Sequence, residues 1–292
     1  MAGEISPLEP GLHLVATPIG NARDITLRAL DILAAADVLA AEDTRSLRRL
    51  MDIHGIELGG RRILPYHDHN GPAMRPRLMA ELAAGRSIAY ASEAGTPLVA
   101  DPGFRLAREA VDAGHTLRVA PGPSAVLAAL AVSGLPTDRF LFAGFAPAQG
   151  GARRAFLADL RNVPATVVLF ESPKRVNRLL GELCESWSGQ RQAAICRELT
   201  KRFEEVQRGS LAELACALAQ RSLKGEVVIV IDRDRGATDT AEAGLAAALR
   251  AALADAPLRD AVDRVAAETG LPRRQVYQTA LTLQRDMGED GD

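Results

Sequence analysis

The chain of 292 residues is long enough for two domains with sizeable cores. Its 35 Lys and Arg against 37 Asp and Glu give a formal net charge of −2, which excludes a uniformly basic nucleic-acid binder but not a local basic face. No apolar run reaches the ~18 residues of a membrane span, no signal-peptide core begins the chain, and three scattered cysteines, Cys184, Cys196 and Cys216, favour buried thiols in a reducing, cytoplasmic setting.

In the first half of the chain, short apolar runs alternate with longer helical patterns. Strands are predicted over 12–17, 37–43, 62–66, 87–92 and 116–121. Helices are predicted over 25–36, 46–55, 72–85, 103–114 and 124–134. This alternation predicts the α/β class, with a largely parallel sheet covered by helices.

The pattern changes in the second half, where strands are predicted over 139–145, 166–172, 193–199, 204–209 and 225–231. Only four residues separate the third and fourth of these, so we expect an antiparallel hairpin within a mixed sheet. The segment AQGGARR, 148–154, has the composition of a loop.

Composition shifts divide the chain into three parts. We place a first α/β domain at 1–136 and a second at 137–235. A polar linker is predicted over 232–244, leading to a small helical domain at 244–292. Within that domain, 258–281 has the pattern of two helices joined by a turn at Gly270, the size of a helix–turn–helix unit.

Polar, glycine and proline residues follow the predicted strands, where an open parallel sheet binds its ligands. The segments are TPIGNARD (17–24), EDTR (42–45), YHDHN (66–70), SEAGTPLVADPG (92–103), APGPSA (120–125) and ESPKR (171–175). No G-x-G-x-x-G follows the first strand and no G-x-x-x-x-G-K-[ST] occurs, so a dinucleotide fold and a P-loop NTPase are not supported. The concentration of these residues predicts a binding site at one end of the sheet.

These loops, together with RELTKRFEEVQRG (197–209), resemble the tetrapyrrole-methylase superfamily, and more closely its small-subunit ribosomal RNA methyltransferase I branch. The resemblance covers about 12–232, and 258–281 fits the small C-terminal piece of that family. It implies two α/β domains, S-adenosylmethionine in the cleft between them, a homodimer, and 2′-O-methylation of a cytidine in the decoding region of 16S ribosomal RNA in the 30S subunit. The chain departs from the pattern at Glu93, where the family has Asp, and at Gly95-Thr96-Pro97, where the wider superfamily has G-D-P.

The resemblance also implies the residues of the cofactor site. We expect S-adenosylmethionine to be bound by Pro18, Gly20, Ser92, Gly95, Thr96, Pro97, Asp101, Pro121, Gly122 and Ser124.

A ribose hydroxyl is a weak nucleophile at neutral pH, so a nearby base would help the reaction. We expect this role to fall to Asp43, Glu42 or His67, with Asp68 and Glu171 as further candidates. Asp43 suits an N-cap of the next helix equally well, and Glu171 can cap the helix that follows it. His67-x-His69 has the spacing of a metal pair, but no third ligand is evident and the chemistry needs no metal, so we predict none.

An RNA substrate needs cations that contact phosphate. We expect Arg45, Arg49, Lys174, Arg175, Lys201 and Arg202 to do so. Arg48 and the pairs 153–154 and 273–274 are further candidates, although paired arginines also occur on ordinary solvated faces. The unit at 258–281 fits either RNA binding or a packing and dimer-supporting role.

Two other functions stay open. The first is methylation of a tetrapyrrole intermediate of the corrin or sirohaem type, and the second is a non-catalytic RNA-binding protein that binds S-adenosylmethionine. EDTR, YHDHN and the C-terminal helical unit favour the ribosomal RNA methyltransferase, because the small-molecule branch is not expected to carry them.

Overall fold

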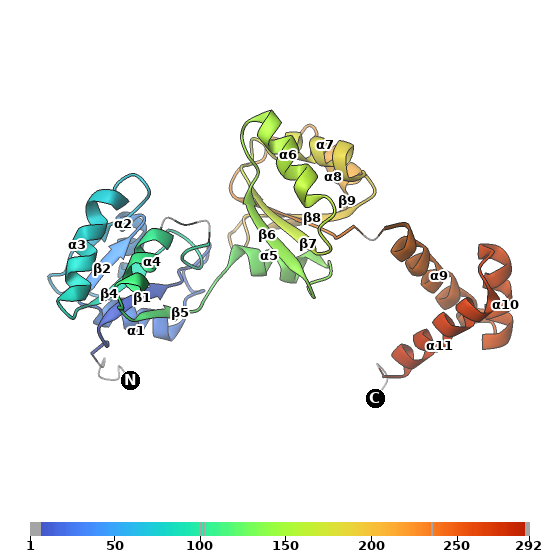
Figure 1. The fold of residues 1–292 in the computed structure, drawn as a ribbon, viewed down its shortest axis with the longest axis horizontal. Coiled ribbons are helices and arrows are strands. Elements are labelled where there is room, and N and C mark those ends of the chain that lie inside the picture. Colours follow the sequence, from blue (N-terminus) through green and yellow to red (C-terminus); the bar gives the residue numbers. More distant parts are fainter. Residues whose placement is uncertain (1–6, 100, 102, 235, 290–292) are drawn as a thin grey trace. The chain divides into compact units, whose positions relative to one another are not determined.

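The computed structural model describes residues 7–99, 101, 103–234 and 236–289 and divides into two compact units, one ending at Asp232 and the other beginning at Arg233 (Figure 1). Each unit has a core of its own. None of the helices in the described part is long and apolar enough to cross a membrane.

The first unit opens with a parallel sheet in the order β3-β2-β4-β1-β5. Its strands are β1 Gly11–Val15, β2 Val38–Ala41, β3 Ile63–Pro65, β4 Ser87–Ala91 and β5 Leu117–Ala120. The helices that follow are α1 Leu27–Ala35, α2 Thr44–Ile53, α3 Gly71–Ala83, α4 Phe104–Asp112 and α5 Ala125–Ser133. The βα alternation predicted from the sequence is confirmed.

Alternate residues of these strands enter two separate cores, as the pleat of a sheet requires. Leu12 and Leu14 pack with α3 and α4 on one face, whereas Val15 packs with α1 and α2 on the other. Caps fix where the helices begin: Thr26 accepts a hydrogen bond from Ala29 N and Asp43 from Arg45 N.

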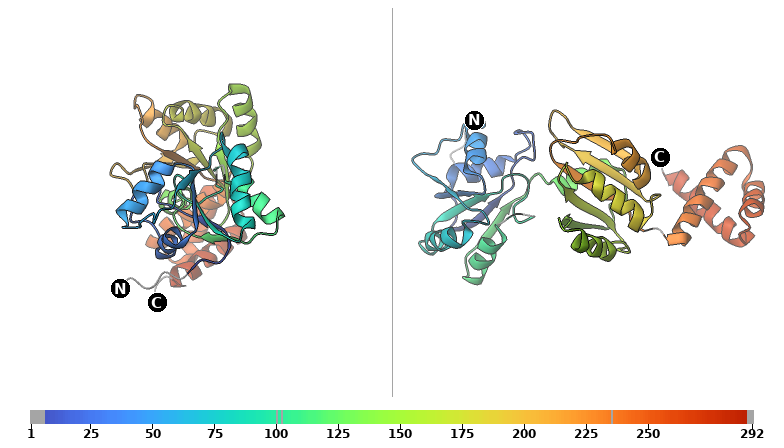
Figure 2. Two further views of the ribbon diagram at one scale, coloured as in Figure 1. Left: turned by 90° about the vertical axis from the view of Figure 1, so that its left-hand side faces the viewer. Right: turned by 90° about the horizontal axis from the view of Figure 1, so that it is seen from above.

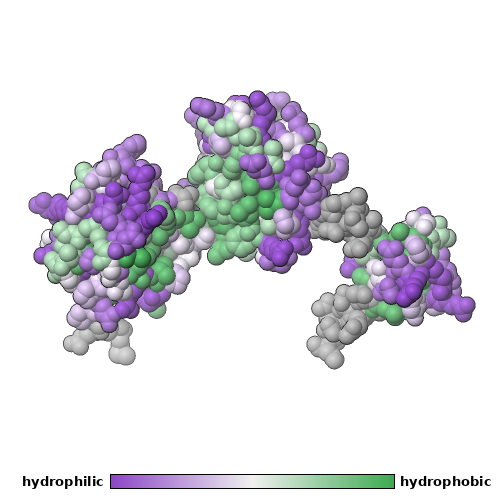
Figure 3. Space-filling model, viewed as in Figure 1, coloured by the Kyte–Doolittle hydropathy of each residue, from purple (hydrophilic) through white to green (hydrophobic). Residues whose placement is uncertain are grey.

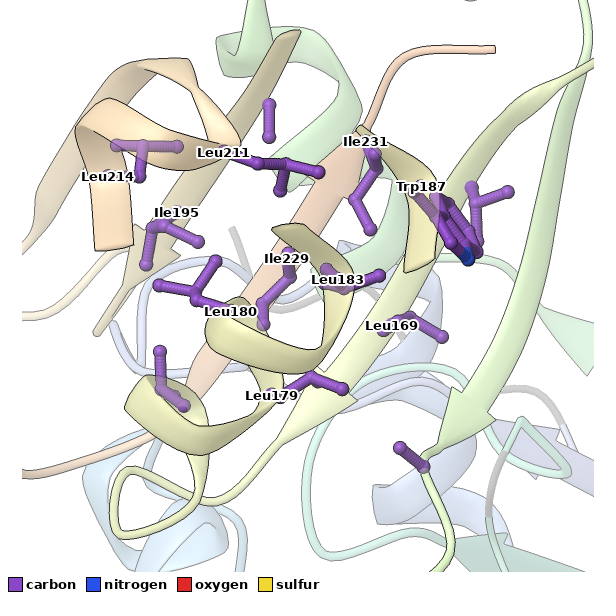
Figure 4. Close-up of a cluster of buried hydrophobic side chains, with 14 of the residues drawn as sticks. Leu169, Leu179, Leu180, Leu183, Trp187, Ile195, Leu211, Leu214, Ile229 and Ile231 are labelled. Atoms are coloured by element: carbon purple, nitrogen blue, oxygen red, sulfur yellow. The ribbon is translucent and has the colours of Figure 1, made fainter. Parts of the chain in front are cut away.

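The second sheet has the order β6-β7-β10-β8-β9, and only β6 and β7 are parallel, so the predicted mixed sheet and the β8–β9 hairpin are confirmed. Its strands are β6 Phe140–Phe145, β7 Thr166–Glu171, β8 Gln192–Arg197, β9 Glu205–Ser210 and β10 Val227–Ile231. Helices α6 Gly150–Leu160, α7 Val176–Trp187 and α8 Leu211–Leu218 cover one face, and the side chains between them and the sheet form the core in Figure 4. Helix α5 covers the other face, against β8 and β10.

The loop predicted at 148–154 is wrong, because α6 begins at Gly150. Its two glycines stand at the first turn, where they cost less than in a helix interior, and the buried guanidinium of Arg153 fixes the helix by pairing with Glu182 on α7. The expectation of buried thiols holds for Cys196 but not for Cys216, which α8 exposes.

In its described residues, 233–234 and 236–289, the second unit contains three helices, α9 Gly236–Asp255, α10 Leu258–Thr269 and α11 Arg273–Glu289, which pack against one another (Figure 2). The linker predicted over 232–244 is wrong from Gly236 onward, where α9 already runs. Polar composition suggested a linker there, but the later part of α9 buries Leu245 and Leu249 in the core of the unit. Gly270 ends α10 in the left-handed conformation, as its place in the sequence predicted.

Candidate active site

Three loops at the carboxyl ends of β1, β4 and β5 are joined by hydrogen bonds. Thr17 and Gly95 exchange two backbone hydrogen bonds of 3.0 Å, and Thr17 Oγ1 donates to Ser92 O. Ser92 Oγ donates to Gly95 O at 2.8 Å, and Thr96 Oγ1 donates to Pro123 O at 2.9 Å. In this loop cluster, formed by the loops after β1, β4 and β5, the side chains of Thr17, Ser92 and Thr96 donate hydrogen bonds to backbone carbonyl groups. The segment after β4 is long because it contacts the loops after both β1 and β5.

The loop after β1 also contacts the segment between β8 and β9. A Cβ built on Gly20 would stand 2.4 Å from Lys201 Cγ and 2.7 Å from Thr200 Oγ1, so only glycine fits there. Asn21 N donates to Thr200 Oγ1 at 3.1 Å. Thr200 has a φ of 65°, which is uncommon for a residue other than glycine and marks a constrained segment beside the site.

A cavity of about 640 Å³ lies at this contact, within the usual size range of small-molecule sites. The first sheet contributes to its lining Pro18, Ile19, Gly20, Glu42, Ser46, Glu93, Ala94, Gly95, Thr96, Val99 and Asp101. Helix α5 and the second sheet contribute Ser124, Ala125, Val126, Phe145, Phe170, Glu171, Ser172, Pro173, Lys201 and residues 225–228, which lead into β10. A smaller cavity of about 170 Å³ shares Pro18, Gly20, Ser46 and Glu93 and also touches Ser92 and Arg49.

Two acids on the first-domain side of the cavity have raised pKa values. Burial raises the pKa of Glu42, whose Oε2 accepts a hydrogen bond from Glu93 N at 3.3 Å. Burial also raises the pKa of Asp101, although Gly103 N and the Tyr90 hydroxyl donate to its Oδ1. Asp101 Oδ2 is buried without a hydrogen-bond partner among the described residues. Such groups commonly mark functional sites.

Of the five candidates for the base, Glu42 and Glu171 line the cavity, whereas Asp43, His67 and Asp68 do not. Asp43 Oδ1 accepts hydrogen bonds from Arg45 N at 2.7 Å and Ser46 N at 3.3 Å, and these lower the pKa of Asp43. Asp43 is therefore the N-cap of α2. His67 lies outside the residues that line either cavity.

The predicted cofactor residues fall into two groups. Pro18, Gly20, Gly95, Thr96, Asp101 and Ser124 line the large cavity. Ser92, Pro97, Pro121 and Gly122 are not among its lining residues. Ser92 Oγ donates to Gly95 O, and a Cβ on Gly122 would lie 2.9 Å from Ala16 Cβ, so these two residues support the loops.

The cations predicted to contact RNA fall into two groups, those exposed to solvent and those paired with acids. Arg45 is 92% exposed at the start of α2, and Lys174, Arg49 and Arg202 are exposed as well. Arg175 and Lys201 instead pair with acids of the second sheet: Lys201 Nζ donates to Glu198 at 3.0 Å and to Glu226 at 2.9 Å.

Sequence reasoning missed Phe145, Phe170 and Glu226 as lining residues. The two phenylalanines stand at the ends of adjacent strands with ring centroids 5.6 Å apart, and Phe145 is 55% exposed. Figure 3 shows a hydrophobic area over the part of the chain that holds β6 and α5. Aromatic residues make up only 4% of the chain, so a phenylalanine at the end of a predicted strand could have been identified from the sequence as a candidate lining residue.

Comparison with known proteins identifies the family to which the chain belongs. Residues 11–215 match the tetrapyrrole (corrin/porphyrin) methylases, and residues 237–284 match the RsmI C-terminal HTH domain. The chain is 48% identical to ribosomal RNA small subunit methyltransferase I of Mesorhizobium japonicum, covering 97% of this chain and 95% of that protein. For the protein of the same name from Mycobacterium tuberculosis the identity is 43%, covering 95% and 96%. The chain belongs to the ribosomal RNA small subunit methyltransferase I family.

The fold recurs in solved structures of low identity. Uroporphyrin-III-C-methyltransferase from Thermus thermophilus is 22% identical with a TM-score of 0.54, covering 76% of this chain and 94% of that one. Diphthine synthase is 17% identical with a TM-score of 0.59, covering 76% and 89%. The predicted fold class is confirmed.

Membership makes the protein a methyltransferase that uses S-adenosylmethionine. The cavity fits this cofactor, which carries a positive sulfonium, an amino group and ribose hydroxyls. The acids that line the cavity, Glu42, Glu93 and Asp101, suit the positive groups.

Proposed function

We propose that the protein transfers a methyl group from S-adenosylmethionine to the 2′-hydroxyl of a cytidine in the decoding region of 16S ribosomal RNA. The similarity to ribosomal RNA small subunit methyltransferases over nearly the whole chain supports this substrate. Bound S-adenosylmethionine supplies a methyl group activated by its sulfonium. The protein's part is to hold the ribose hydroxyl in line with that methyl group, exclude water and accept the proton.

The observation that carries the choice of substrate is the acidic lining. Glu42, Glu93 and Asp101 line the cavity without a Lys or Arg partner in the described part of the chain. Lys201 lines it too, but two glutamates already hold its ammonium group. A tetrapyrrole intermediate carries several carboxylates around its rim, which an acidic cavity would repel. A cytidine offers a neutral ribose and base, and its phosphates can stay outside beside Arg45 and the other exposed arginines of α2.

We assign the role of general base to Glu42. Burial disfavours its charged form and raises the pKa of Glu42, which makes the carboxylate a stronger proton acceptor. The lowered pKa of Asp43 makes it a poorer base, and its carboxylate is committed to α2. His67 lies outside the lining of the cavity.

The cofactor would be held mainly by backbone groups of the loop cluster. We assign Pro18, Gly20, Gly95 and Thr96 to its first-domain wall and Ser124 to the wall at the start of α5, with the carboxylate of Asp101 as an acceptor for a hydroxyl or amino group. Ser92, Pro97, Pro121 and Gly122 would act by supporting these loops.

We also propose a homodimer that acts on the 30S subunit in the cytoplasm. Both sheets end in an edge strand with exposed apolar side chains: Val119 on β5 is 47% exposed and Phe140 on β6 is 45% exposed. Exposed apolar edges are commonly covered by a partner.

Methyl transfer from radiolabelled S-adenosylmethionine to 30S subunits lacking native methylation tests the proposal. We expect label on a cytidine 2′-hydroxyl after digestion to nucleosides. Label on a base, or label only on a tetrapyrrole offered in parallel, would overturn it. Cofactor binding with no transfer to 30S subunits, free 16S RNA or tetrapyrrole would favour the non-catalytic alternative.

A further inference from the structure

A buried tyrosine of the first domain is hydrogen-bonded to an acid of the cavity. Tyr90 lies on β4 in the core that packs against α3 and α4, and none of its surface is exposed. Its hydroxyl donates to Oδ1 of Asp101 at 2.9 Å, and Gly103 N donates to the same oxygen at 2.7 Å. Asp101 lines the cavity, whereas Tyr90 and Gly103 do not. Two groups outside the cavity therefore hold a carboxylate that belongs to its wall.

The ring of Tyr90 also fixes the path of the loop that contains Asp101. A Cβ built on Gly103 would stand 2.4 Å from Tyr90 Cε1 and 2.8 Å from Asp101 Oδ1, so only glycine fits there. Earlier in the same loop, Leu98 packs against the core of Tyr90 with a φ of 70°, which is uncommon for a residue other than glycine. Because core side chains are close-packed, the ring is a firm support for this loop.

The hydroxyl of Tyr90 acts on Asp101 as a donor. Burial, and after it the charge of Asp101, raises the pKa of Tyr90 far above its usual range, so the hydroxyl keeps its proton. Burial also raises the pKa of Asp101, and the hydrogen bonds from Gly103 and Tyr90 oppose that rise. Asp68 after β3 and Glu42 after β2 face Asp101 as like charges, which disfavour its ionised form. The tyrosine thus favours the ionised carboxylate against its acidic neighbours.

We infer that Tyr90 is a positioning residue for the cofactor: its hydroxyl holds the carboxylate of Asp101 in the orientation that accepts the amino group or a ribose hydroxyl of S-adenosylmethionine. The inference rests on the proposed function, in which Asp101 accepts from the cofactor, and it adds the group that orients this acceptor. A carboxylate already held by two donors loses little freedom when a ligand binds, and such preorganisation increases affinity.

The same core contains a matched control. Tyr66 packs edge-to-face against Tyr90, with ring centroids 5.8 Å apart, and is only 1% exposed. Its hydroxyl is hydrogen-bonded by Arg75, which pairs with Glu109 on α4, outside the lining of the cavity. Replacing either tyrosine by phenylalanine removes one oxygen atom from the same core, but only the change at Tyr90 removes a donor from Asp101.

Cofactor binding as a function of pH tests the inference. The affinity for S-adenosylmethionine is measured by calorimetry from about pH 4 to about pH 8 for the wild type, Tyr90→Phe and Tyr66→Phe, a range that covers the usual spread of Asp pKa values. Without the donor, the pKa of Asp101 rises, so the ionised carboxylate that binds the cofactor is lost at a higher pH. We expect the pH midpoint of the affinity to move upward by about one pH unit in Tyr90→Phe, as one hydrogen bond to a charged group provides. Tyr66→Phe should leave the midpoint in place.

A double-variant comparison shows whether the effect of Tyr90 passes through Asp101. Asp101→Asn should weaken cofactor binding by about tenfold or more and remove this pH midpoint, because the titrating group is gone. Adding Tyr90→Phe to Asp101→Asn should then change the affinity by less than about twofold, since two residues that act as one unit are not additive.

An unmoved midpoint in Tyr90→Phe, or a loss of affinity by the same factor at every pH, would overturn the inference and make Tyr90 an ordinary core residue. Wild-type affinity in Asp101→Asn would overturn it as well, because Tyr90 would then have no path to the cofactor. Failure of the proposed function shows separately, as absence of ribose label when the wild type is given 30S subunits.

Discussion

Two acids that line the cavity and two acids of the second domain are placed in opposite ways. In the first domain, Glu42 and Asp101 lie in the cavity without a cation, and burial raises their pKa values. In the second domain, Glu182 on α7 and Glu205 on β9 are each paired with two arginines, and their pKa values are lowered. A partly buried acid without a cation costs stability and is suited to proton transfer, whereas an acid paired with arginines stabilises the fold. Removing the charge should therefore have opposite effects in the two regions.

Glu42→Gln should produce the largest effect, a fall in kcat of about 10²- to 10⁴-fold, the usual contribution of a general base. Because burial raises the pKa of Glu42 above its unfolded value, the ionised group lowers stability at neutral pH, so the variant should be as stable as the wild type or more stable. The kcat of the wild type should fall as pH drops through the pKa of Glu42. Steady-state kinetics and urea unfolding check both statements, and an active or destabilised variant would contradict the comparison.

Arg153→Met should destabilise the second domain by about 3 kcal/mol, the lower end for a broken buried pair because Arg178 still partly compensates Glu182. Arg153 is 2% exposed and also donates to Pro147 O and Ala148 O. The matched control is Arg178→Met: it pairs with the same glutamate but is 61% exposed, so it should cost less than about 1 kcal/mol. Equal losses in urea unfolding would contradict the claim that burial decides the effect.

Glu205→Gln should have the smallest effect, visible as a change in the pH dependence of stability. Side-chain hydrogen bonds from Arg221 and Gln207 lower the pKa of Glu205 to about 2, from an ordinary 4.5. A lowered pKa means that its contribution is present above about pH 4.5 and is lost as pH falls toward 2. Unfolding at pH 7 should show the variant less stable than the wild type, and the difference should shrink at pH 3. If the difference in stability between the variant and the wild type grew at low pH, the predicted effect of the lowered pKa of Glu205 would be contradicted.

The spacing of hydrophobic residues and the helix caps are local features of the sequence, and they were enough to predict the strands and helices of the two α/β domains. The run LHLV predicted β1, and the side chains of Thr26 and Asp43 begin α1 and α2 with contacts only two or three residues away. The glycines and prolines after the strands indicated where the site lies, because the ends of parallel strands meet at one edge of a sheet. For the same reason, six of the ten predicted cofactor residues line the cavity.

Only the tertiary structure decided which distant acid holds a given cation. Lys201 was indistinguishable from Arg202 as a cation, yet Glu226, 25 residues away in the sequence, accepts a hydrogen bond from its ammonium group. Composition likewise predicted a loop before Arg153 and a linker through Gly236, where burial against distant side chains stabilises helices instead.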